Sequence, residues 1–182
     1  MARRRNRQNT PFVPKVFPIF EYTIESLDME GRGIARGEDG KVVFVEGALP
    51  FERVRAELIR EKSSFNQART MQVLKASPER VKPKCKAFGV CGGCAMQHMD
   101  ARAQVAAKQR VLEDNLQRIG RVTPDTILRP IAGPTWGYRY RARLSVRNVH
   151  KKGTVMDRSR GKIGGYVAEM EACAVLVLSR IH

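Results

Sequence analysis

Four cysteines are the residues of this sequence whose type and spacing could support chemistry. Cys85, Cys91 and Cys94 fall within one ten-residue stretch, and Cys173 follows much later in the chain. Thiolates bind soft metal ions and attack electrophiles, and paired thiols form disulfides. A catalytic thiol is typically single and close to a base, and a disulfide between Cys91 and Cys94 would close a strained loop. The pattern therefore favours metal binding.

Inert packing of the thiols is the main alternative to a metal site. Free cysteine packs as a small apolar residue, but a glycine-containing loop with little apolar bulk does not suit a core. Gly92 and Gly93 allow the loop to curl so that backbone N–H groups face sulfur atoms. Zinc sites usually contain two short cysteine pairs, and only Cys91 and Cys94 form one here. The spacing favours an iron–sulfur cluster and leaves zinc open, with His98 as a possible further ligand that we expect to hydrogen-bond locally.

The net charge indicates what the protein binds. Thirty-four Lys and Arg residues against 18 Asp and Glu residues give a net charge of +16 and a pI near 10.4. Such an excess repels itself unless a polyanion neutralises it, which predicts a nucleic-acid partner. We find neither an apolar stretch of about 18 residues nor a helix with one basic and one bulky apolar face, so a membrane is not expected as the partner.

The N-terminal residues 1–18 predict a flexible basic leader. Their arginines are not followed by the apolar stretch of a secretory signal, so we expect a cytoplasmic protein, in which structural disulfides are rare. The leader could also contact RNA phosphates.

Residues 19–77 predict a small barrel that would hold nucleic acid. Glycines punctuate short β-rich runs, with a hairpin signal at residues 39–40, and Val54, Ala56 and Leu58 alternate with charged residues, so that strand has one buried face. Five short strands without a long helix predict an OB-like barrel, which often binds single-stranded nucleic acid on one face. Within it, charge and aromaticity together favour three RNA contacts, although Phe65 could be a core residue: Lys62, Phe65 and Arg69.

Residues 78–182 predict the cysteine segment, one helix and the start of an antiparallel sheet, so the fold class is mainly β with α (α+β). Asp100 is a plausible N-cap and Gly120 a plausible C-cap. Four apolar residues form one stripe between these caps: Val105, Leu112, Leu116 and Ile119.

Strict alternation over residues 138–147 predicts a strand with a cationic face. Residues 148–153 look like a hairpin tip, and a second strand pair is expected through 162–167. A cluster of like charges on one strand face favours an anion above it, so we expect RNA to contact this face; a solvated face is the alternative. Trp136 could stack on a base or fill a core. The cationic residues are Arg139, Arg141, Arg143 and Arg147.

Taken together, these features resemble the ribosomal RNA uracil-C5 methyltransferases. The resemblance runs from about residue 20 to residue 182, and the Cys85-x5-Cys91-Gly92-Gly93-Cys94 motif with Cys173 is its most specific part. A barrel combined with the cysteine set is typical of the branch that acts on 23S rRNA, because transfer-RNA relatives lack the cysteines and some rRNA relatives lack the barrel. The other matching motifs lie at residues 31–35, 43–50, 97–98, 116–120, 136–144 and 173–176.

The resemblance implies a TRAM domain at residues 19–77 and a [4Fe–4S] cluster held by the four cysteines. It implies methyl transfer from S-adenosylmethionine to C5 of a uridine in 23S rRNA, which needs a cysteine nucleophile and a base from a Rossmann-like domain. All four cysteines are assigned to the cluster, and the glycines at 161–165 lack the G-x-G-x-x-G spacing. We therefore expect no catalytic and no S-adenosylmethionine-binding residue here, and interpret the chain as an N-terminal portion, inactive alone.

Two other interpretations are weaker. Radical enzymes that use S-adenosylmethionine also carry TRAM barrels, but the five-residue gap before Cys91 does not match their Cys-x3-Cys-x2-Cys site. A stand-alone RNA-binding or ribosome-assembly module with a zinc or iron–sulfur site is the main alternative. In either case we expect a monomer whose partner is RNA, with 23S rRNA favoured and DNA not expected.

Overall fold

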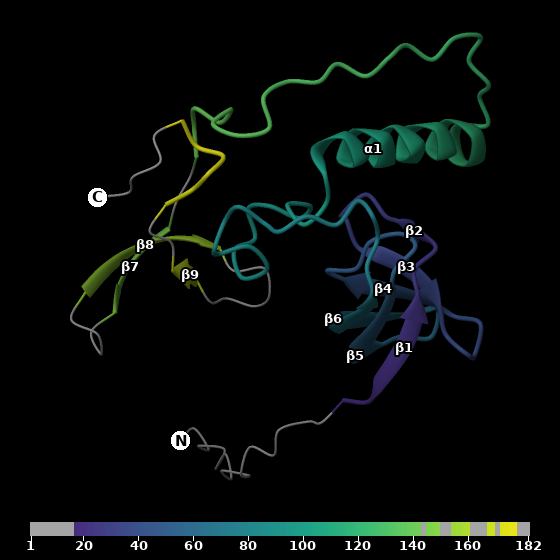
Figure 1. The fold of residues 1–182 in the computed structure, drawn as a ribbon, viewed down its shortest axis with the longest axis horizontal. Coiled ribbons are helices and arrows are strands. Elements are labelled where there is room, and N and C mark those ends of the chain that lie inside the picture. Colours follow the sequence, from purple (N-terminus) through teal and green to yellow (C-terminus); the bar gives the residue numbers. More distant parts are fainter. Residues whose placement is uncertain (1–16, 143–144, 150–153, 161–166, 170–171, 178–182) are drawn as a thin grey trace, which may run out of the picture.

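The computed structural model describes residues 17–142, 145–149, 154–160, 167–169 and 172–177 (Figure 1). Most of the leader at residues 1–18, together with Arg143 and the hairpin tip at 150–153, lies outside these residues, so the expectations for them stay predictions. Among the described residues, none of the helices has the length and hydrophobicity of a membrane-spanning segment.

The N-terminal part is a sheet that closes into a barrel. Its order is β1-β5-β6-β4-β3-β2, so β1 and β2 are the two edges although they follow each other in the chain. Between them, Ile24 N–H donates to the carbonyl of Glu52 (2.9 Å) and Glu25 N–H donates to that of Ile34 (2.8 Å). One bent strand therefore closes the sheet, which leaves five strands, as the sequence predicts. The bounds are β1 (Ile19–Thr23), β2 (Ser26–Leu27), β3 (Gly33–Arg36), β4 (Val42–Glu46), β5 (Arg53–Glu61) and β6 (Phe65–Lys75).

Alternation along the strands fills the barrel with small apolar side chains. Val43 and Val45 on β4, and Val54 and Ala56 on β5, are fully buried, as predicted for β5, while the residues between them face outward. The hairpin signal is also confirmed, because Gly40 adopts a φ of +76° between β3 and β4, a conformation that glycine tolerates without strain.

A buried ion pair fastens the barrel to the chain that follows it. Glu52 is fully buried, and its two carboxylate oxygens accept hydrogen bonds from the guanidinium of Arg80 at 2.5 and 2.7 Å. The same oxygens accept hydrogen bonds from the backbone N–H groups of Leu49 and Ser77. The charge of Glu52 is therefore compensated on all sides, which a buried carboxylate requires.

This ion pair lies at the neck of the cysteine loop, residues 82–97. The two ends of the loop are paired, since Val81 N–H donates to the carbonyl of His98 at 2.9 Å. The loop also packs on the barrel: a Cβ atom added to Gly31 would lie 2.7 Å from the side chain of Met96. The barrel and the cysteine loop are thus in direct contact.

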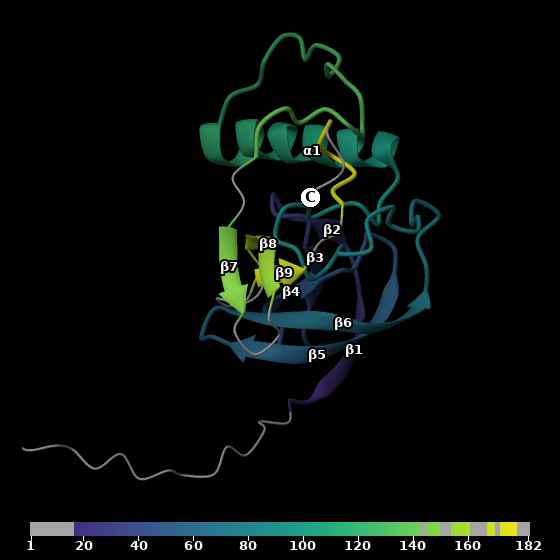
Figure 2. The ribbon, with the colours of Figure 1, turned by 90° about the vertical axis from the view of Figure 1, so that its left-hand side faces the viewer.

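A helix follows the cysteine loop and lies outside the barrel (Figures 1 and 2). It consists of α1 (Ala101–Asn115) and a π-helical turn, η1 (Leu116–Gly120). Asp100 caps it as predicted, because its carboxylate accepts a hydrogen bond from Arg102 N–H.

The helix does not end as predicted. Arg121, not Gly120, adopts the left-handed conformation, with a φ of 51°. The carbonyl of Leu116 accepts hydrogen bonds from both Arg121 and Val122, so the chain reverses one residue later than the glycine signal suggests.

A second, small sheet has the order β7-β8-β9. Its strands are β7 (Ser145–Val149), β8 (Thr154–Arg160) and β9 (Val167–Glu169). β7 and β8 are antiparallel with Val149 opposite Thr154, as the predicted hairpin requires, and β8 pairs with β9. Of the strand pair predicted through 162–167, only Val167 lies within the described residues, so that expectation stays a prediction.

The predicted strand at 138–147 is only partly correct. Its ladder begins at Ser145, whereas Arg139 forms just an isolated bridge with Leu176. Tyr138 and Tyr140, on the side of the segment expected to face a core, are both exposed. Alternation alone does not distinguish a strand backed by a core from an extended surface segment.

Candidate nucleic-acid interface and metal centre

One outer face of the barrel carries two aromatic rings between two cations. Phe44 points outward on β4 because Val43 and Val45 on either side point into the core. The ring of Phe65 on β6 meets that of Phe44 edge-on, with 5.5 Å between centroids. The guanidinium of Arg32 lies 4.7 Å from the centre of the Phe44 ring, and the ammonium of Lys62 lies 5.7 Å from that of Phe65. We call Arg32, Phe44, Lys62 and Phe65 the stacking face.

The strands and turns around the stacking face hold these side chains in place. Lys62 N–H donates to the carbonyl of Phe65 at 3.0 Å, which fixes the turn between β5 and β6. Arg32, in the turn before β3, donates to the carboxylate of Asp28 at 2.6 Å, so its guanidinium is oriented over Phe44. In an OB-like barrel, these turns and the adjoining strands are the parts that bind oligonucleotides.

Two of the three barrel residues expected to contact RNA, Lys62 and Phe65, belong to the stacking face. Phe65 is half-buried on the outer surface and is not a core residue. Arg69, the third, lies further along β6, where its Nε is 3.9 Å from the Glu46 carboxylate, so part of its charge is neutralised. Sequence reasoning missed Phe44 and Arg32, although the alternation of residues 42–46 could have indicated that Phe44 faces outward.

The cysteine loop, which carries Cys85, Cys91 and Cys94, is built from tight turns. Phe88 N–H donates to the carbonyl of Cys85, and Cys91 N–H donates to that of Ala87. Gly93 N–H points at Cys91 Sγ, at 3.3 Å, and a Cβ on Gly93 would lie 3.4 Å from that sulfur. This is the N–H-to-sulfur arrangement that the glycines predict.

The pKa of Cys94 depends in part on electrostatic repulsion by the other three cysteines. Burial raises the pKa of the Cys94 thiol, a hydrogen bond with Gln97 lowers it, and repulsion by Cys173, Cys91 and Cys85 raises it further. The net effect is a raised pKa. The Cys94 thiol would therefore form a thiolate readily only if a cation neutralised it.

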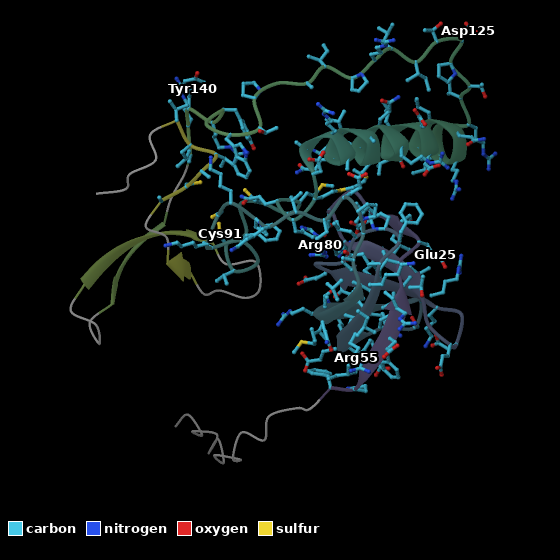
Figure 3. All side chains as sticks on the ribbon, in the orientation of Figure 1. Glu25, Arg55, Arg80, Cys91, Asp125 and Tyr140 are labelled. Atoms are coloured by element: carbon cyan, nitrogen blue, oxygen red, sulfur yellow. The ribbon has the colours of Figure 1, made fainter. Side chains whose placement is uncertain are left out.

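Cys173 reaches the loop through a separate segment. Residues 172–177 pair with residues 137–139, where Gly137 N–H donates to the carbonyl of Ala174 and Arg139 N–H donates to that of Val175. Within the described residues, no group of three or more His, Cys, Asp or Glu side chains is arranged as a metal site. The [4Fe–4S] cluster stays a prediction. Figure 3 shows Cys91 in its loop.

A second group of aromatic and basic residues borders the cysteines. The Lys84 ammonium lies 5.2 Å from the centre of the Trp136 ring, and the Arg139 guanidinium lies 5.9 Å from that of Tyr138. Arg139 and Arg141 are exposed, as an RNA contact requires. Arg143 lies outside the described residues, and Arg147 lies on β7.

His98 lies at the neck of the cysteine loop, where its carbonyl accepts a hydrogen bond from Val81 N–H. It is buried, with 2% of its surface exposed, and its ring lies 5.2 Å from that of Phe88. The ring therefore packs at the neck of the loop, and whether it is a further metal ligand stays a prediction.

Comparison with known proteins identifies relatives of this chain. The TRAM domain family matches residues 15–69. A 23S rRNA (uracil(1939)-C(5))-methyltransferase of Burkholderia lata is 55% identical over 177 residues, and those of Polaromonas sp. and Cupriavidus metallidurans are 53% and 57% identical over 180 and 158 residues. The chain is a homologue of these methyltransferases. The matched stretches cover 94%, 97% and 84% of this chain.

The shared stretch is a minor part of each homologue. The chain spans 38%, 37% and 34% of the lengths of these three methyltransferases. The TRAM match agrees with the predicted barrel. The solution structure of a conserved protein from gene locus MMP0076 of Methanococcus maripaludis is 32% identical and covers 40% of this chain, with a TM-score of 0.29.

Proposed function

We propose that this chain is the RNA-binding and [4Fe–4S]-carrying portion of an S-adenosylmethionine-dependent methyltransferase that forms 5-methyluridine in 23S rRNA. The stacking face carries most of this proposal. Aromatic rings flanked by cations bind unpaired bases by stacking and their phosphates by charge. The names of the homologues indicate that the RNA is 23S rRNA. The net charge of +16 attracts RNA over long distances.

The four cysteines have the donor chemistry that an iron–sulfur cluster needs. Cys85, Cys91, Cys94 and Cys173 would provide four thiolates, and the Gly93 N–H already faces one sulfur. When bound, such a cluster supplies a rigid cross-link and the capacity to exchange one electron. We propose the structural role, in which the cysteine loop is tied to the segment at 172–177 and RNA is oriented beside it.

The chain's own residues bind and orient RNA and do not perform the methyl transfer. Uracil C5 is activated when a thiolate adds to C6, and a base must then remove the C5 proton. The four thiols are assigned to the cluster, so the nucleophile must come from elsewhere in the enzyme. We expect the chain by itself to transfer no methyl group from S-adenosylmethionine to 23S rRNA, and to act in the cytoplasm as a monomer.

Purification without oxygen tests this proposal. We expect a brown protein with iron and acid-labile sulfide in equal amounts, which binds a 23S rRNA fragment more tightly than DNA of the same sequence. Cys94→Ser should lose the colour and much of its solubility. A colourless zinc protein would instead favour the stand-alone module, and a Cys94→Ser variant that stays folded and binds rRNA normally would contradict the structural role of the cluster.

A further inference from the structure

A long groove with aliphatic and charged side chains in its lining lies between α1 and the segment that follows it. Residues 121–136 run back alongside α1 without helix or strand (Figures 1 and 2). With α1 they bound a groove of about 1090 Å³. Aliphatic side chains from both sides line it, among them Val105, Leu112, Ile127, Leu128 and Ile131.

The described part of the chain leaves these side chains uncovered. The exposed fraction is 53% for Leu112, 82% for Leu128 and 101% for Ile131. Isolated apolar residues on a surface are ordinary, but a continuous patch of them marks an interaction site.

The groove has two walls, α1 and residues 123–136; in the described part of the chain, the first lacks buried side chains and the second lacks backbone hydrogen bonds. No residue of α1 is buried, and an isolated helix of this length is marginal in water. Within the described residues, the backbone of residues 123–136 forms no backbone–backbone hydrogen bond, and irregular segments of this length are uncommon in compact domains. Both walls therefore need a further surface to pack against.

We propose that the groove is the docking surface for the polypeptide that the homologous methyltransferases carry outside the stretch shared with this chain. Their shared stretch is only 38% of the Burkholderia lata protein, so each homologue has a larger remainder. A covalently linked occupant acts at a high effective concentration, which a second copy of the chain lacks.

RNA fits this groove less well. Lys82, Arg102, Lys108, Trp136 and Tyr138 also line the groove. Its strongly exposed side chains Leu128 and Ile131, however, are aliphatic and offer neither a π face for base stacking nor a charge for phosphates. The occupant we infer is a folded protein surface with apolar side chains. This inference rests on the sequence kinship with the methyltransferases, so its test does not depend on RNA binding.

A fusion tests the docking surface. The chain replaces the matching stretch of the Burkholderia lata methyltransferase, and amide hydrogen exchange of α1 is compared in the fusion and in the chain alone. We expect α1 to exchange about tenfold more slowly, or slower still, in the fusion. Unchanged exchange in the core strands of the barrel reports that both proteins are folded.

Point variants in the fusion show whether the groove causes the slowing. Leu112→Lys and Ile131→Lys should each restore fast exchange of α1. Met71→Lys is the matched control, because Met71 lies on β6 outside the groove and is 59% exposed; it should leave the exchange unchanged.

Three results would overturn the proposal. Equal exchange of α1 in the fusion and the chain alone would mean that the remainder does not cover it. Protection of the isolated chain that increases with protein concentration and is lost in Leu112→Lys would identify a second copy as the occupant. Protection that appears only when a 23S rRNA fragment is added to the isolated chain would identify RNA.

Discussion

Phe44 is the single residue on which the RNA-binding proposal depends most. Its ring lies beneath the Arg32 guanidinium and nearly perpendicular to the ring of Phe65, on the outer side of β4, whose neighbouring valines fill the core. It therefore contributes little to the core, and its position is best explained by a ligand that stacks.

Replacing this ring should weaken RNA binding without unfolding the barrel. We expect Phe44→Ala to reduce affinity for a short unpaired oligoribonucleotide by about tenfold or more, because base–aromatic stacking contributes about 1–3 kcal/mol and about 1.4 kcal/mol corresponds to tenfold. Fluorescence anisotropy measures the affinity, and thermal unfolding checks the fold. Phe20→Ala on β1, where Phe20 is 43% exposed, is the control; an equal loss in both variants would remove the basis for the stacking face.

The sequence predicted two of the four residues of the stacking face, Lys62 and Phe65. Lys62 and Phe65 are adjacent to a turn and carry a local signal of charge beside an aromatic. The approach of Phe44 to Phe65 arises from the parallel pairing of β4 with β6, in which Val42 lies opposite Phe65. Pairing between strands so far apart in the chain has no local signal, so Phe44 and Arg32 were missed.

At the scale of elements, the Glu52–Arg80 ion pair joins the barrel to the cysteine loop. Removing one member of a buried pair leaves the other charge unpaired in the interior, which costs about 3–5 kcal/mol. We expect Arg80→Met to lower the free energy of unfolding by an amount near the lower end of this range, because the Arg80 side chain is 24% exposed. Urea unfolding measures this loss.

The exposed pair between Arg55 and Glu21 provides the matched control. Its side chains are 52% and 46% exposed, so Arg55→Met should change the free energy of unfolding by less than about 1 kcal/mol. A loss in Arg80→Met no larger than that in Arg55→Met would show that the buried pair does not hold the neck.

The same pair makes stability depend on pH. Burial raises the pKa of Glu52, but the hydrogen bonds from Arg80, Leu49 and Ser77 outweigh it and hold this pKa below its ordinary value of 4.5. A carboxyl whose pKa is lowered by folding stabilises the protein fully above its unfolded value and loses this contribution as the pH falls through the folded value.

The free energy of unfolding should therefore decrease as the pH is lowered below 4.5. Glu52→Gln should be less stable at neutral pH and should show a smaller decrease on acidification, because it lacks the titrating group. Urea unfolding at several pH values measures both slopes. Identical slopes in the two proteins would mean that other carboxyl groups cause the acid sensitivity.

The elements themselves were largely predictable, and their connections were not. The barrel strands and the Asp100 cap follow from alternation and local hydrogen bonding, which short sequence windows contain. The late end of the helix at Arg121 depends on a π-helical turn, and the Glu52–Arg80 pair joins residues 28 apart. Neither has a signature in a short window.

At the scale of the whole molecule, the barrel that carries the stacking face is joined to the cysteine loop. The neck at Arg80 and the contact between Gly31 and Met96 hold the cysteine loop against the barrel. RNA bound to the stacking face is therefore held close to the cysteine loop. The net charge predicted the nucleic-acid partner from composition alone, whereas the uncovered groove beside α1 became visible only once the packing was known.

Ultraviolet cross-linking of the chain, purified without oxygen, to a 23S rRNA fragment tests the central claim most directly. Mass spectrometry of the cross-linked peptides should find Phe44 and Phe65, with further cross-links at Tyr138 or Tyr140 beside the cysteines. DNA of the same sequence should give markedly fewer of these cross-links. Cross-links confined to the basic residues 1–18, or equal yields with RNA and DNA, would contradict the account.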